Sequence, residues 1–275
     1  MALDILFEHP NVGPFISRQL IQRLTTSAPS NAYVARVASV FESGLFVLPN
    51  EESVGTGRRG DLAPVWAAIL LDAEFLNSAK NESRTFGKVR EPVIRFVHWA
   101  RFANIDMVEV SNDPSLNQDQ TIELIGQSPF RSQSVFNFYR PGFIAAGTET
   151  AAAGLTAPEL QISSGALLIN QANFMDEYVL REPGLANTRG SDDTHGPLGF
   201  AGTYETEIAI VDDPQALADH LNLFLTAGRM TDLTRTRIVE AISSVQFDGS
   251  EESAKAIVQL GVLATVNSPA FLVQR

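Results

Sequence analysis

The chain has 275 residues, of which 44% are hydrophobic, and this is enough to bury a sizeable core and to exclude a largely disordered protein. Its formal net charge of -12 disfavours nucleic acid as a partner, because an acidic surface repels the phosphate backbone. The chain contains no cysteine, which excludes disulfides, cysteine-ligated zinc, iron–sulfur clusters and thiol nucleophiles.

The N-terminal part of the chain is predicted to be helical. Residues 2–8 form a short apolar turn, which His-Pro ends. Pro14 then opens an amphipathic helix, FISRQLIQRLTT, in which Arg18, Gln22 and Arg23 are expected to face water.

Further helices are marked by residues that typically cap or open a helix. Ser30 is the predicted N-cap of NAYVARVASVFES, and Asp61 is the predicted N-cap of LAPVWAAILLDAEFL, with a glycine-rich polar loop at 48–60 between them. Pro92 stands in the first turn of PVIRFVHWARFA. QTIELIG is predicted to be a short helix that ends at Gly126.

The C-terminal part is also mainly helical. SSGALLINQANFMDEYVLR predicts a helix, and a long loop follows it at 184–207, a length that is often functional. Three helices then come in order, DDPQALADHLNLFLTAG, DLTRTRIVEAISSV and SEESAKAIVQLGVLATVN. The best candidate strand is ETEIAIV at 205–211, and it is short.

These elements predict a mainly α protein, an irregular multi-helix bundle with long loops and at most a minor β element. We expect one domain over 1–275, with 1–147 and 148–275 as candidate sub-units. No apolar run reaches the roughly 18 residues that a membrane-spanning helix needs. The start, MALDILFEHPNVGPF, has no basic region before its apolar residues and does not match a signal peptide.

Aromatic residues and arginines gather in GQSPFRSQSVFNFYRPG, at 126–142. One interpretation is an irregular buried connector whose rings pack between helices. The other is a ligand groove with aromatic walls and an arginine clamp for an acidic or sugar-like group. The candidate ligand-binding residues of that groove are Phe130, Arg131, Phe138, Tyr139 and Arg140.

A second candidate site is the polar run TRGSDDTHG at 188–196. Ser191 with Asp192, Asp193 and His195 offers a nucleophile, carboxylates and a base, or oxygen ligands for a divalent cation; a solvated turn-rich loop explains the same composition. His98, on an apolar helix, is the other candidate base, and a hydrogen-bonded core histidine is its alternative reading.

Known motifs for cofactors are missing from the sequence. No HExxH or paired-histidine spacing supports a zinc hydrolase, and GTGRRGD at 55–61 lacks the Lys-Ser/Thr ending of a phosphate-binding loop. No G-x-S-x-G nucleophile elbow occurs. We therefore expect neither a metal ion nor a cofactor.

Several segments, taken in order, resemble one bacterial family. They are HPNVGPFISRQLIQRL, GDLAPVWAAILLDAE, GKVREPVIRFVHWARF, GQSPFRSQSVFNFYRPG, LTAPELQI and NSPAFLVQR. Together they are similar to the large bacterial proteins of the domain of unknown function 1800 family, roughly to their C-terminal half. The resemblance implies a mainly helical fold and an exported or periplasmic bacterial protein, often found beside a sulfatase-like partner. It implies no reaction and no catalytic residue.

Two functions remain open from the sequence. The first is a helical binding or assembly module of an exported bacterial system, with a small molecule or a protein as its partner. The second is a hydrolase acting on ester bonds without a metal, in which His195 or His98 is the base and Asp192 or Asp193 supports it. The sequence does not indicate the oligomeric state.

Overall fold

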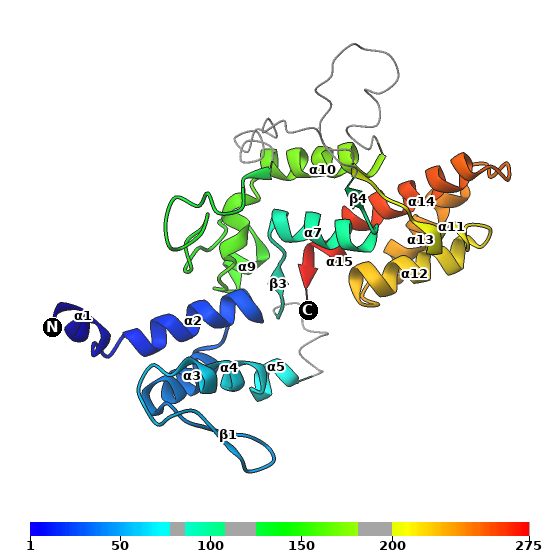
Figure 1. Ribbon diagram of the computed structural model, residues 1–275. Helices are drawn as coiled ribbons and strands as arrows, with labels where there is room; N and C mark the ends of the chain where they lie inside the picture. Colours follow the sequence, from blue (N-terminus) through cyan, green and yellow to red (C-terminus); the bar gives the residue numbers. More distant parts are fainter. Residues whose placement is uncertain (78–85, 108–124, 181–199, 275) are drawn as a thin grey trace. The chain divides into compact units, whose positions relative to one another are not determined.

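The computed structural model describes residues 1–77, 86–107, 125–180 and 200–274, and they form a mainly helical protein with very little strand (Figure 1). This confirms the predicted fold class. The chain divides into two compact units: unit 1 contains Met1–Val89 and Tyr139–Gln161, and unit 2 contains Arg90–Phe138 and Ile162–Gln274. The single domain expected over 1–275 stays a prediction, because two compact units can fold together or separately.

Both chain segments of unit 1 contribute helices, and the first segment also contains one small hairpin. Its elements are α1 (Ala2–Phe7), α2 (Val12–Leu24), α3 (Asn31–Ser43), β1 (Phe46–Val47), β2 (Ser53–Val54), α4 (Leu62–Leu70), α5 (Ala73–Leu76), β3 (Lys88–Val89), α9 (Glu149–Ala152) and the 3-10 helix η1 (Pro158–Ile162). Strand β1 pairs antiparallel with β2, with Phe46 opposite Val54.

The predicted caps of unit 1 are confirmed. The Ser30 side chain accepts a hydrogen bond from the Tyr33 N–H at 3.0 Å, and the Asp61 carboxylate accepts one from the Ala63 N–H at 3.1 Å. The helix predicted after Asp61 ends earlier than expected, at Leu70. Asp72 caps the separate short helix α5 through a bond from the Glu74 N–H.

The predicted water-exposed face of α2 is wrong for one residue, Gln22. The helix begins at Val12, so Pro14 lies inside its first turn, where its missing N–H costs no hydrogen bond. Gln22 was expected to face water, but it is buried and its amide donates to backbone carbonyls. The sequence correctly predicted that this segment is a helix. It could not indicate that a distant segment of the chain, at Pro141, covers this face of α2.

The core of unit 1 lies between α2, α3 and α4. Its fully or nearly buried side chains are Ile21, Tyr33, Val34, Val37, Phe41, Val65, Ala68 and Ile69. The Tyr33 hydroxyl donates to the Ile69 carbonyl at 2.6 Å, and burial raises the pKa of Tyr33 to about 12. Helix α3 ends at Gly44, whose φ of +64° and close approach to the Arg58 backbone leave no space for a Cβ.

Unit 2 is a bundle around α14. Its elements are α7 (Pro92–Phe102), β4 (Asp106–Met107), α10 (Gly165–Leu180), β5 (Phe200–Ala201), α11 (Glu205–Ile208), α12 (Pro214–Thr226), α13 (Asp232–Ser243), α14 (Glu251–Val266), α15 (Pro269–Leu272) and β6 (Val273–Gln274). Helix α14 contacts α10, α12 and α13, and β4 pairs antiparallel with β5 (Figure 1).

The core of unit 2 is larger than that of unit 1. Its fully buried side chains include Trp99, Leu217, Leu221, Leu225, Val258, Val262 and Phe271. The Trp99 indole N–H donates to the Tyr204 hydroxyl at 3.0 Å, so the one polar atom of this buried ring has a partner. Gly261 lets α12 and α13 approach α14 closely, since an added Cβ would lie 3.0 Å from Leu221.

The strand predicted at 205–211 is wrong, because Glu205–Ile208 is a helical turn, α11. The short strand of this region is β5, which lies earlier in the chain. Ile208 and Val211 both pack against the core of unit 2, and their spacing of three suits a helical turn better than a strand. The apolar pattern of residues 205–211 is too short to distinguish the two-residue repeat of a strand from the 3.6-residue repeat of a helix.

Two other predicted elements fall largely outside the described residues. These are the short helix at 120–126 and most of the loop at 184–207. Within the described part of the chain, no helix is both long and apolar enough to cross a membrane.

Candidate functional site

A polar pocket of about 320 Å³ lies within unit 1. It is formed by α2, the loop before α3, the start of α3, the start of α5, Phe86 and the segment at 154–156. The polar and aromatic residues that line it are Arg18, Ser30, Asn31, Glu74, Phe86 and Thr156. Residues from five separate parts of the sequence therefore meet here.

Arg18 is the cation of the pocket. Its Nη2 donates to the Asn31 Oδ1 at 3.0 Å. Among the residues that the structure describes, no carboxylate lies within ion-pair distance of Arg18. A guanidinium has five N–H donors, so one bond to a neutral amide leaves donors and a full positive charge for a ligand.

Glu74 lines the same pocket, but its charge is engaged by other residues. It accepts a hydrogen bond from the Ser30 hydroxyl at 2.5 Å and one from the Ser30 N–H at 3.3 Å. The Arg36 Nη2 lies 3.9 Å from the Glu74 Oε2, and Arg36 also binds Asp72. The pocket therefore carries one engaged negative charge and one positive charge without an ionic partner among the described residues.

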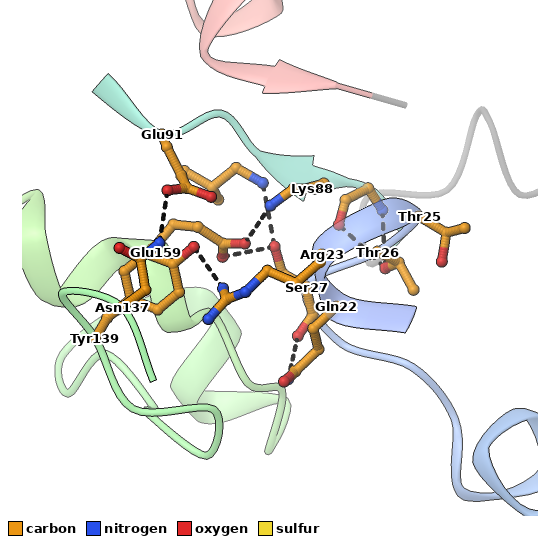
Figure 2. Close-up of polar contacts among 12 residues, drawn as sticks. Gln22, Arg23, Thr25, Thr26, Ser27, Lys88, Glu91, Asn137, Tyr139 and Glu159 are labelled. Carbon is orange, nitrogen blue, oxygen red and sulfur yellow. Dashed lines mark hydrogen bonds and ion pairs between the residues drawn. The ribbon is translucent and has the colours of Figure 1, made fainter. Parts of the chain in front are cut away.

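Beside the pocket lies a buried polar cluster of Ser27, Lys88 and Glu159, which Figure 2 shows in close-up. The Lys88 ammonium lies 2.9 Å from the Glu159 Oε1, and the Ser27 hydroxyl donates to the Glu159 Oε2 at 2.8 Å. The Ser27 oxygen also accepts a bond from the Val89 N–H at 3.1 Å. Because its hydroxyl is used as both donor and acceptor, Ser27 acts here as a structural residue.

The buried polar cluster holds the walls of the pocket in place. The carbonyl of Ser27 accepts a hydrogen bond from Thr156, which lines the pocket, at 2.8 Å. It also accepts one from Gln22 at 3.1 Å (Figure 2). The same Gln22 amide donates to the Pro141 carbonyl at 2.9 Å. The Ser27 N–H donates to the carbonyl of Gly87, which follows Phe86. The loop that precedes α3 is therefore tied to three other segments of unit 1.

The predicted aromatic–arginine site is divided between the two units. Phe130 and Arg131 are exposed and Phe138 is half-buried, all three in unit 2. The φ of +60° places Phe130 in the left-handed region. Tyr139 and Arg140 begin the second segment of unit 1.

Tyr139 and Arg140 contact other parts of unit 1. Tyr139 is buried, and its hydroxyl accepts a hydrogen bond from Arg23 at 2.6 Å, with the guanidinium carbon 4.7 Å from the ring centre. This is a cation–π contact, and its arginine lies outside the stretch 126–142. The N–H of Arg140 donates to Gln161 at 2.9 Å, and its side chain is exposed. Ligand binding by these residues stays a prediction.

His98 lies half-buried on α7 in unit 2. Its Nε2 donates to the Phe224 carbonyl at 3.2 Å, and its ring stacks on Phe271 with centres 5.3 Å apart. Burial lowers the pKa of His98, and the charge of Arg90 lowers it further. The other catalytic candidates, Ser191, Asp192, Asp193 and His195, lie outside the described residues.

Sequence reasoning did not single out the residues of the pocket. The helical pattern of α2 predicts that Arg18 faces water, but no local pattern indicates that the segment at 154–156 lines the same pocket. The Lys88–Glu159 pair joins residues 71 positions apart. In unit 2, the contact between His220 and Glu207, 2.7 Å long, was likewise not predicted.

Comparison with known proteins identifies one family and no individual related protein. No curated protein matches the chain, and no solved structure matches it. A family model described as "Protein of unknown function (DUF1800)" matches residues 1–273. The chain therefore belongs to this family, which is the family that its segments resemble.

Proposed function

We propose that the chain is a helical binding module and that the pocket of unit 1 holds a small anionic ligand. The observation that carries the proposal is Arg18, a cation that lines a pocket of about 320 Å³ without an ion-pair partner among the described residues. This volume is at the lower end of the range typical of small-molecule sites. Arg18 is the contact for a carboxylate or a similar oxyanion of the ligand.

The start of α3 supports the same ligand chemistry. Asn31 is the first residue of this helix of 13 residues and also lines the pocket. The first N–H groups of a helix lack intrahelical partners, and the helix dipole places partial positive charge there. Asn31 also orients Arg18 through its side-chain oxygen, so the guanidinium and the helix end act on the same ligand group.

Glu74 restricts the charge of the ligand. Its carboxylate lines the pocket and disfavours a second negative group nearby, because like charges in a partly buried site repel. We therefore propose a ligand with a single carboxylate and a small polar or apolar body, for which Phe86 supplies an apolar contact.

Arg18→Met is expected to weaken the binding of a small monocarboxylate by roughly 10- to 100-fold, because a charge-assisted hydrogen bond contributes about 1.5–3 kcal/mol. Methionine keeps much of the volume and removes the charge. The measurement is isothermal titration calorimetry of wild type and variant against a panel of amino acids, sugar acids and short hydroxy acids.

The matched control is Arg58→Met, which removes the charge of an exposed arginine of unit 1 outside the pocket. It should leave the affinity unchanged. Equal affinities of wild type and Arg18→Met, with Arg58→Met also equal, would contradict the assignment of this pocket. The proposal also includes a role in assembly and the exported or periplasmic setting that the family resemblance implies.

Ester hydrolysis is the alternative function, and it rests on the sequence alone. For this alternative we expect wild-type activity on short- and medium-chain acyl esters, and loss of that activity in His195→Ala or in His98→Ala. Circular dichroism of each variant is the control for folding. Inactivity of the wild type across the panel would remove the hydrolase and leave the binding module.

A further inference from the structure

Unit 2 contains two buried arginines, Arg90 and Arg95, and the first of them has an evident electrostatic partner. Arg90 donates to the carbonyls of Leu225 and Phe271, at 3.2 and 2.9 Å. These carbonyls lie at the C-terminal ends of α12 and α15, where helices carry partial negative charge. The Phe271 ring also lies 4.9 Å from the guanidinium carbon of Arg90. Carbonyl dipoles and an aromatic face therefore compensate the charge of Arg90.

Arg95 has no comparable set of partners. It lies on α7 with 8% of its surface exposed, and its Nη2 donates to the Gln171 Oε1. Its Nε is buried and has no hydrogen-bond partner. Within the described ranges, no carboxylate lies within ion-pair distance of it.

Gln171 is held so that its oxygen faces Arg95. The Gln171 amide nitrogen donates to the carbonyls of Ile125 and Ile162, each at 3.0 Å. These two bonds fix the orientation of the amide group and leave Oε1 for the arginine. The arrangement orients the guanidinium, but a neutral oxygen supplies only part of the compensation that a buried charge needs.

A buried arginine cannot avoid this electrostatic cost by losing its proton. Burial lowers the pKa of Arg95 to about 10, which still leaves the group charged at neutral pH. A buried charge is normally paired, and an unpaired one strongly destabilises the folded state. Arg95 therefore combines a buried positive charge with a buried Nε–H donor that has no hydrogen-bond partner among the described residues.

We propose that Arg95, oriented by Gln171, binds a small oxyanion within unit 2. The Nε–H without a partner is the donor directed at this anion, and an arginine edge matches two oxygens of a carboxylate, sulfate or phosphate. This site is separate from the pocket of Arg18 in unit 1, and neither proposal depends on the other.

The test is the melting temperature as a function of anion concentration. The wild type is first dialysed into chloride, and sulfate, phosphate and acetate are then titrated at constant ionic strength. Because an anion that binds the folded state stabilises it by mass action, we expect the melting temperature to rise by about 2–5 °C for each tenfold increase above the dissociation constant. The ranking of the three salts distinguishes a tetrahedral oxyanion from a carboxylate.

Two variants assign the effect to Arg95. Both variants are made in an Arg18→Met background, which removes the carboxylate response of the unit 1 pocket. In that background Arg95→Met should abolish the dependence on the anion, whereas Arg101→Met, which removes an exposed arginine of the same helix, should retain it. If Arg95→Met does not fold, Gln171→Glu decides, because it places a carboxylate against Arg95 and should remove the response to added anion. A wild type that responds to none of the three anions beyond chloride, or a response that persists in Arg95→Met or Gln171→Glu, would overturn the proposal.

Discussion

Glu159→Gln is expected to lower the free energy of unfolding by about 3–5 kcal/mol, because it removes the carboxylate charge that lies 2.9 Å from the buried Lys88 ammonium. The Glu159 side chain is 1% exposed and that of Lys88 is 11% exposed, so water compensates neither group. Glutamine keeps the size of the side chain and preserves an acceptor for the Ser27 hydroxyl. The loss therefore measures charge and not packing.

Denaturant unfolding followed by circular dichroism measures the change, and Glu240→Gln is the matched control. Glu240 pairs with Arg237 at a similar distance, 2.9 Å, but the two side chains are 56% and 72% exposed. An exposed pair of this kind contributes roughly 0–1 kcal/mol. Two losses of similar size would show that burial of the Lys88–Glu159 pair has no energetic consequence.

A double-mutant cycle identifies the partner. Lys88→Met should also be costly by itself, because it removes the ammonium that lies 2.9 Å from the buried Glu159 carboxylate. The double variant Lys88→Met/Glu159→Gln removes both charges, so its loss should be well below the sum of the two single losses. Additive losses would indicate that the two groups are not coupled.

The elements that the sequence predicted best are those whose cause is local. Ser30 and Asp61 cap their helices through bonds to residues two or three positions away, and a short stretch of sequence contains both partners. The strand predicted at 205–211 failed for the opposite reason. Seven residues fit either period, and packing against distant helices selects the helical turn of α11.

The candidate site was not predictable in the same way, because its residues meet only through long-range contacts. Ser27 and Glu159 are 132 positions apart, and Arg18 is brought to the segment at 154–156 by that contact and its neighbours. The arginine that contacts Tyr139 is Arg23, which is 116 residues away and lies outside 126–142. The composition of that stretch therefore could not indicate the partner of Tyr139.

Leu221→Ala is expected to lower the free energy of unfolding by about 2–5 kcal/mol, through lost apolar burial and the cavity that remains. Leu221 is fully buried on α12 at the centre of unit 2. Its neighbourhood is tightly packed, since a Cβ added to Gly261 would lie only 3.0 Å from its side chain. Rigid helices on all sides limit how far the surroundings can collapse into the space.

Leu223→Ala on the same helix is the control, because Leu223 is 61% exposed and its loss should cost less than about 0.5 kcal/mol. The two leucines have equal helix propensity and lie two residues apart, so only burial differs between the variants. Equal losses in urea or guanidinium unfolding would mean that α12 does not bury Leu221 in solution.

Leu221→Ala and Glu159→Gln together also test the single domain expected over 1–275, since they lie in different units. If the chain unfolds as one cooperative unit, each variant lowers the same single transition by its own free energy. If the two units unfold separately, Glu159→Gln lowers one transition and Leu221→Ala lowers the other. In the second outcome, each anion would stabilise only the unit that contains its site. An anion bound at the Arg18 pocket would then shift the unfolding transition of unit 1, and one bound at Arg95 would shift that of unit 2.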